Sequence, residues 1–158
     1  MGFTPDSSYG ICHCEKGLLD FEVHGKNDSA VVKRFVSGTV PNAVPFKAEC
    51  VLHCSDEEVK KLQAASKKLD VAFDITPTEG GCQIVSHGQA AHASTPWNGV
   101  NAASYLVELL SQVFSKEQLG TFFGFIHEKI GLATDGSQIG VQMSLSLIHI
   151  SEPTRLRC

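Results

Sequence analysis

A histidine in a turn-rich segment is the first residue that could do chemistry. His92 lies in the stretch from His87 to Gly99, which is rich in small residues and turn formers and shows no helical or strand periodicity. A loop between a strand and a helix can present such a side chain on a rigid scaffold. Imidazole carries protons or donates hydrogen bonds near neutral pH. The alternative is an ordinary surface histidine, since the chain has seven histidines.

Two other polar side chains follow prolines. Asn42 stands between Pro41 and Pro45, where its amide could bind a ligand through its donors and acceptor or simply serve the turn. Asp6 follows Pro5, and a Pro-Asp turn is the ordinary interpretation. A carboxylate is also a competent zinc ligand, but a single one cannot hold the metal. Residue type alone leaves these alternatives open.

The six cysteines could indicate a metal site or disulfides. Structural zinc sites usually use CxxC-like pairs, and this chain has none. An intracellular protein normally keeps its thiols reduced. The spacing therefore favours buried or idle thiols over a zinc site. The six are Cys12, Cys14, Cys50, Cys54, Cys82 and Cys158.

Strands interleaved with helices must position these residues. Alternation of apolar and polar residues predicts strands over the ranges below, and the turn-forming stretch from Pro77 to Gly81 joins the last two as a hairpin. Pro41 and Pro45 force an irregular segment after the second strand. The predicted strands cover 19–24, 30–36, 47–53, 71–76 and 82–85.

Helical spacing replaces the strand pattern at two points. Ser55 can cap a helix over 55–69, because Glu58 can return the bond to the cap. A second apolar stripe starts at Val100 and runs to residue 114, and residues 119–130 could form a third helix. Two amphipathic helices among strands predict an α+β fold, an open-faced sandwich of the ferredoxin-like kind, with both helices on one face of a mainly antiparallel sheet.

Composition excludes several classes of protein. With 13 basic and 17 acidic residues the formal charge is -4, and no basic tract suggests a nucleic-acid partner. No apolar run approaches the roughly 20 residues that a membrane span needs, and the N-terminus has no signal-peptide pattern. We therefore predict a cytoplasmic globular protein.

Three segments together resemble a known family. The sequence GQAAHASTPWNGVNAASYL, residues 88–106, resembles the G-x-AAH-x-x-x-P-x-x-G-x-NA stretch in the lid of PepV-like zinc dipeptidases, a carnosinase-like (Xaa-His dipeptidase) group of di-zinc exopeptidases. SGTVPNAVPFKA, residues 37–48, is similar to their GG-x-x-x-N-x-VP-x-x-A segment. GFTPD followed by CEKG resembles their GFTPDA-x-FP-x-x-x-x-EKG. The three matches occur in the family's order and reach from residue 2 to about residue 143.

The resemblance implies a function and roles for single residues. Enzymes of this family hydrolyse dipeptides with two zinc ions, and an inserted lid closes over the substrate. His92 matches the lid histidine that stabilises the oxyanion, Asn42 matches a lid asparagine that binds substrate, and Asp6 matches a zinc-binding aspartate. Asn101 is expected to cap a helix, and Gly88 and Gly99 to be required by the backbone.

The same resemblance implies an incomplete enzyme. Residues 1–10 would be a remnant of the catalytic zinc domain and 11–144 a truncated lid, so the chain alone should be inactive and should not retain zinc. Ser7 to Gly10 depart from the family pattern, which weakens the transfer to Asp6. Residues 145–158 share no rhythm with the rest and are expected to be a non-native tail with few contacts. The alternative function is a non-catalytic α+β binding or dimerisation module, and the oligomeric state is left open.

Overall fold

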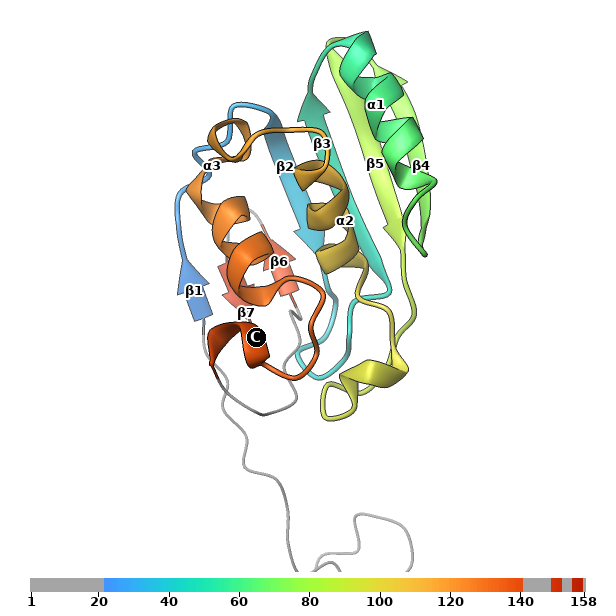
Figure 1. Ribbon diagram of the computed structural model, residues 1–158. Helices are drawn as coiled ribbons and strands as arrows, with labels where there is room; N and C mark the ends of the chain where they lie inside the picture. Colours follow the sequence, from blue (N-terminus) through green and yellow to red (C-terminus); the bar gives the residue numbers. More distant parts are fainter. Residues whose placement is uncertain (1–21, 141–148, 152–154, 158) are drawn as a thin grey trace, which may run out of the picture.

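The central part of the fold is a sheet of four antiparallel strands. The computed structural model describes residues 22–140, 149–151 and 155–157 (Figure 1). The four strands are β2 (Val32–Ser37), β3 (Lys47–His53), β4 (Ala72–Thr78) and β5 (Gly81–His87). Three short strands extend this sheet, namely β1 (Glu22–His24), β6 (His149–Ser151) and β7 (Arg155–Arg157). Within the described residues the sheet therefore has seven strands in the order β1-β7-β6-β2-β3-β5-β4, and every neighbouring pair is antiparallel.

Strand β3 shows how the predicted alternation becomes a buried face. Ala48, Cys50 and Leu52 point to the same side and are at most 2% exposed, whereas Lys47 and His53 are exposed. Period-2 alternation puts successive side chains on opposite faces of a sheet, so one face of β3 is apolar and buried, and the other is polar apart from the half-buried Val51. The predicted strand 47–53 is therefore confirmed in both its bounds. The hairpin of β4 and β5 is confirmed as well.

Two helices cover the apolar face at the points predicted for them. Helix α1 (Asp56–Ser66) packs on β4 and β5, and α2 (Ala102–Ser111) packs on β3 and β5 beside α1. Figure 1 shows both on the same face of the sheet. Ser55 and Glu58 form the predicted capping box at α1, and Asn101 caps α2 through its side-chain oxygen. Both helices are shorter than predicted. Helix α1 ends at Ser66 and not at residue 69, and α2 begins only after the cap at Asn101 and ends at Ser111.

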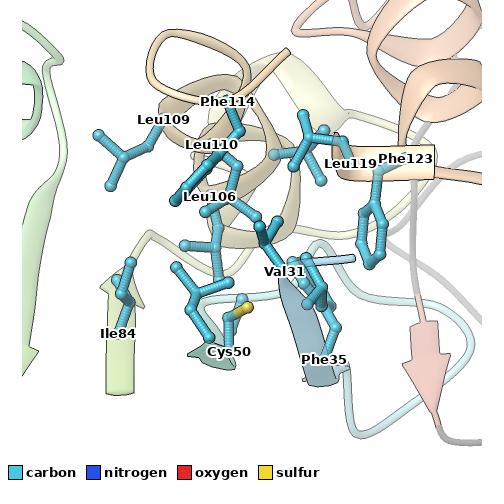
Figure 2. Close-up of a cluster of buried hydrophobic side chains, with 14 of the residues drawn as sticks. Val31, Phe35, Cys50, Ile84, Leu106, Leu109, Leu110, Phe114, Leu119 and Phe123 are labelled. Atoms are coloured by element: carbon cyan, nitrogen blue, oxygen red, sulfur yellow. The ribbon is translucent and has the colours of Figure 1, made fainter. Parts of the chain in front are cut away.

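The hydrophobic core lies between these helices and the sheet. Figure 2 shows Leu106 and Leu110 of α2 facing side chains of the central strands, among them Cys50 and Ile84. All four of these side chains are fully buried. Burying apolar area is the main force that holds such layers together, at roughly 25 cal/mol per Å² removed from water. The helices are therefore fixed to the sheet by their apolar stripes.

A third helical region extends the layer toward β2. Helix α3 (Lys116–Phe125) continues into a short π-helix, η2 (Ile126–Ile130), and a 3-10 turn, η3 (Ser137–Ile139), follows. Phe123 of α3 packs on Phe35 of β2 with ring centroids 5.4 Å apart.

In the described part of the chain no helix is both long and apolar enough to cross a membrane.

Helix α3 is not the single uninterrupted helix that the sequence predicts. Gly120 has φ +81°, which breaks the helical path, and a Cβ there would lie 2.3 Å from Oδ1 of Asp28. The same carboxylate accepts hydrogen bonds from the backbone N–H and the hydroxyl of Thr121, at 2.9 and 2.7 Å. Asp28 thus caps the turn that restarts after Gly120, and only glycine allows this close approach.

The α+β class is confirmed, and the ferredoxin-like order is met by part of the sheet. β3, α1, β4, β5 and α2 follow one another, and β5 lies between β3 and β4, as in a split βαβ unit. In the ferredoxin-like βαββαβ pattern a strand after the second helix lies beside the first strand. Here β2, which precedes β3 in the chain, occupies that place.

The terminal segment differs from its prediction. No place in the fold is expected for residues 145–158, yet β6 (His149–Ser151) lies beside β2, and β7 (Arg155–Arg157) lies between β6 and β1 (Glu22–His24). The expectation of few contacts is therefore wrong for these two stretches. Pairing at a sheet edge uses backbone groups, which any sequence can offer, so a missing side-chain pattern does not prevent it.

Candidate functional site

Two loops at one end of the sheet are joined by backbone hydrogen bonds. The loop over 38–46 follows β2 and the loop over 88–99 follows β5, and Figure 1 shows both at the same end of the sheet. Ala43 and His92 form an antiparallel bridge. The backbone N–H of Val44 donates to the carbonyl of Ala91, and that of Ala93 donates to the carbonyl of Asn42, each at 2.9 Å. The two loops therefore form one unit.

Further bonds hold this unit to the rest of the fold. Gln89 and Val100 exchange two backbone hydrogen bonds of 2.9 Å, which close the base of the second loop. The backbone N–H of Gly88 donates to the carbonyl of Phe46 at 2.7 Å, and that of Ala102 donates to the carbonyl of Pro45 at 2.9 Å. Since Ala102 is the first residue of α2, both loops are tied to a helix that is itself packed on the sheet. The packed helix and sheet therefore hold both loops in place.

Two glycines make this approach of backbone segments possible. A Cβ on Gly88 would lie 2.1 Å from the carbonyl oxygen of Val100, and one on Gly99 would lie 2.8 Å from the carbonyl oxygen of Gln89. Real Cβ atoms do not come so close to backbone oxygens, so any larger residue would push the loop open. The prediction that Gly88 and Gly99 are required by the backbone is confirmed by these contacts.

His92 projects from this unit with an exposed side chain. Its Nδ1 lies 2.8 Å from Oγ of Ser94 and accepts a hydrogen bond of 3.2 Å from the Ser94 backbone N–H. The His92 carbonyl accepts a bond of 2.9 Å from the backbone N–H of Thr95, which closes the turn. Within the described part of the chain, Nε2 has no hydrogen-bond partner. One ring nitrogen is thus engaged and the other is available.

The structure brings two of the three predicted site residues together. Asn42 is exposed and lies beside the bridge of Ala43 and His92, so it neighbours the histidine although the two are far apart in the sequence. Asp6, predicted as a metal ligand, lies outside the described residues. The chemical roles of all three remain predictions, and the geometry establishes only that the backbone of Asn42 lies next to the backbone of the His92 segment.

Exposed apolar side chains accumulate on the same two loops. Val40 is 44% exposed and Phe46 52% exposed in the first loop, and Trp97 in the 3-10 turn η1 (Pro96–Asn98) is 57% exposed. Large apolar side chains gathered on polar loops are typical of surfaces that meet a ligand or another protein. Neighbouring Pro96 is buried, so the turn that carries Trp97 is anchored.

The described residues do not supply a metal site. Across 22–140, 149–151 and 155–157, no three side chains of the His, Cys, Asp or Glu type come together as metal ligands. Cys54 and Cys82 form no disulfide, and Sγ of Cys54 lies 3.8 Å from Sγ of Cys82. Burial raises the pKa of the Cys82 thiol to about 12, and burial also raises the pKa of Cys54. These two thiols are protonated near neutral pH, which suits the interpretation as idle thiols.

Ser94 is the functional candidate that the sequence analysis missed. Its only signal is its position two residues after a histidine in a turn, where serine often bonds to neighbouring groups. A serine two residues after a histidine is common in loops, and this spacing alone does not predict a contact with a nitrogen of the imidazole ring. The contact becomes visible only when the loop conformation is known.

Comparisons with known proteins show similarity to peptidases. Residues 79–139 match a family model described as "Peptidase dimerisation domain". The chain is 31% identical over 147 residues to "Beta-Ala-Xaa dipeptidase" of Lactobacillus delbrueckii subsp. lactis, which covers 88% of this chain and 31% of that protein. It is 28% identical over 149 residues to "Putative dipeptidase YtjP" of Bacillus subtilis, which covers 89% of this chain and 32% of that protein. The chain thus spans about a third of the length of the curated relatives it matches.

Proposed function

The chain is a relative of the M20 peptidases that contains their dimerisation domain, and we propose that it acts as the substrate-covering lid of a dipeptidase. The observation that carries the proposal is the joined pair of loops, which holds the exposed residues His92 and Asn42 on neighbouring backbone segments at one end of the sheet. The exposed apolar residues on the same loops support closure of this end over another surface.

In this role His92 donates a hydrogen bond to the substrate. When water or hydroxide attacks a peptide carbonyl, negative charge develops on its oxygen. A donor placed at that oxygen can lower the barrier by about 2.7 to 4 kcal/mol. His92 can serve because Nε2 is exposed and has no partner in the described part of the chain. Asn42 would hold the substrate through its amide, which both donates and accepts.

Zinc would act in the complete protein through residues other than the described ones. Metal ions in such hydrolases polarise the carbonyl and generate hydroxide at neutral pH. Since the described residues bring no three ligand-type side chains together, we assign the lid no metal-binding step. Asp6 remains the proposed ligand from this chain. Cys54 and Cys82 remain thiols although their Sγ atoms are 3.8 Å apart, which favours a reducing compartment, so we propose a cytoplasmic location.

The experiment that tests the lid role is the kinetics of a His92→Ala variant in a full-length dipeptidase carrying this segment. The proposal requires a lower kcat with an unchanged metal content, because the histidine belongs to the lid. A variant with wild-type kcat, or one that loses metal, would overturn the role of His92.

A second candidate function is self-association through the sheet edge. β4 is the last strand of the sheet in the described residues, and all its side chains except Phe73 and Ile75 are exposed. An open edge offers unpaired backbone groups to a strand of a second copy. The match to a peptidase dimerisation domain supports this candidate. Sedimentation of the chain over a wide concentration range tests it, and a monomer at every concentration would exclude it.

A further inference from the structure

The contact between Ser94 and His92 fixes which ring nitrogen can donate. The backbone N–H of Ser94 points at Nδ1 of His92, 3.2 Å away. A backbone N–H can only donate, so Nδ1 must carry a lone pair and no proton. In the neutral ring the proton therefore resides on Nε2. The Ser94 hydroxyl, 2.8 Å from Nδ1, can rotate to donate to the same atom.

We propose that Ser94 is a positioning residue for the proposed oxyanion chemistry of His92, which makes this inference dependent on the proposed function. Ser94 holds the imidazole in the tautomer with a proton on Nε2 and fixes the orientation of the ring. Nε2 then offers its N–H outward, since it has no partner in the described part of the chain. A neutral imidazole in the other tautomer would present a lone pair to the oxyanion and repel it.

The loop geometry explains why this orientation is fixed before substrate arrives. The bridge of Ala43 and His92 holds the backbone on one side of the histidine, and the bond from Thr95 N–H to the His92 carbonyl closes the turn on the other. Only the torsions of the side chain remain free, and the two contacts from Ser94 restrict them. Preorganised donors are effective because they require no reorientation during the reaction.

The tautomer can be measured on the chain itself, without any activity. Long-range ¹H–¹⁵N correlation spectra, recorded at a pH high enough to keep the ring neutral, distinguish a proton on Nε2 from one on Nδ1. We expect the Nε2–H form and a rigid ring in the wild type. In Ser94→Ala the backbone N–H remains, so we expect the same tautomer with greater ring mobility. A wild-type ring that is mainly Nδ1–H would overturn the proposal.

Kinetics in a full-length dipeptidase carrying this segment test the positioning role. Ser94→Ala should lower kcat about 2- to 10-fold, the effect of one ordinary hydrogen bond, with little change in KM. Ser94→Thr, which keeps the hydroxyl, should restore most of the loss. In a His92→Ala background, Ser94→Ala should have no further effect on kcat, because the residue acts through the imidazole. Ser66→Ala, at the end of α1, is the matched control and should keep wild-type kcat.

The variants separate two kinds of failure. If His92→Ala keeps wild-type kcat, the proposed function of His92 fails, and the role of Ser94 fails with it. If His92→Ala is strongly impaired but Ser94→Ala is not, only the role of Ser94 fails. If Ser94→Ala lowers kcat equally in the wild type and in His92→Ala, Ser94 supports the loop generally and the positioning role is excluded.

Discussion

The backbone carbonyl of Asn42 accepts a hydrogen bond of 2.9 Å from the backbone N–H of Ala93, the residue that follows His92. This bond and the neighbouring bridge of Ala43 and His92 make one surface from two segments that are distant in the sequence. Because backbone groups provide the connection, it survives changes in the side chains of Asn42 and His92. Substitutions at these two positions can therefore report on chemistry without loss of the loop structure.

His92→Ala should lower kcat of a full-length dipeptidase carrying this lid by about 100-fold or more, the usual effect of removing one donor to an oxyanion. KM should change little, because the bond strengthens only as charge develops on the carbonyl oxygen. His53→Ala is the matched control, since His53 is an exposed histidine at the other end of β3. Steady-state kinetics and metal analysis on the same preparation provide the measurement.

The 158-residue chain by itself should neither retain zinc nor cleave dipeptides. A catalytic zinc normally needs three protein ligands and a water, and the family resemblance supplies only Asp6. Dialysis against zinc followed by metal analysis checks the binding, and a dipeptide hydrolysis assay checks the activity. Stoichiometric zinc that is lost in Asp6→Ala would show that this chain completes a metal site.

Asn101→Ala should lower the free energy of unfolding by about 0.5 to 2 kcal/mol, the usual range for loss of a helix cap. Its side-chain oxygen accepts bonds of 3.0 and 3.2 Å from the N–H groups of Ala103 and Ser104 at the start of α2. Urea unfolding measures the change. Asn98→Ala is the control, because Asn98 is exposed and its hydrogen bond to the carbonyl of Thr95 comes from the backbone N–H, which alanine keeps. Equal stability of the two variants would contradict the capping role.

Stability should fall as pH rises from about 9 to about 12, in part because of Cys82. Burial raises the pKa of this thiol from 9.0 to about 12 in the folded state. In that window the unfolded chain loses the thiol proton while the folded chain keeps it, so the unfolded state gains stability. One such group contributes a slope of at most about 1.4 kcal/mol per pH unit.

The comparison of wild type with Cys82→Ala isolates this contribution. Urea unfolding at several pH values should give a shallower decline for the variant, although its stability at pH 7 is reduced by the small cavity that it leaves. Titrating groups other than Cys54, which contacts Cys82, affect both proteins alike. Parallel declines in the two proteins would show that Cys82 ionises equally in both states.

Local chemistry in the sequence was sufficient to predict most of the elements. The capping box of Ser55 and Glu58 and the cap at Asn101 are both present, because a cap depends on residues within one turn of it. The strand 47–53 was predicted correctly because its alternation matches a sheet with one buried face. These signals act over a few residues and do not depend on the rest of the fold.

Features that depend on distant residues could not be predicted from local patterns. The break at Gly120 depends on the approach of Asp28, and no pattern around residue 120 reveals it. The proximity of Asn42 and His92 could be inferred only through the family resemblance, because backbone hydrogen bonds between loops impose no periodic pattern on the sequence. β6 and β7 pair through backbone groups as well, which explains why the terminal segment was misjudged.

The carboxylate of Asp28 has a consequence for the order in which the chain folds. It caps the turn after Gly120, although nearly the whole described region separates the two in the unfolded chain. Closing so long a loop costs conformational entropy, whereas Ser55 caps α1 from the adjacent position. Pulsed amide exchange during refolding should therefore protect the amides of α1 before that of Thr121, and the reverse order would contradict this. The second half of α3 is then completed late in folding, once the segment before β2 has docked.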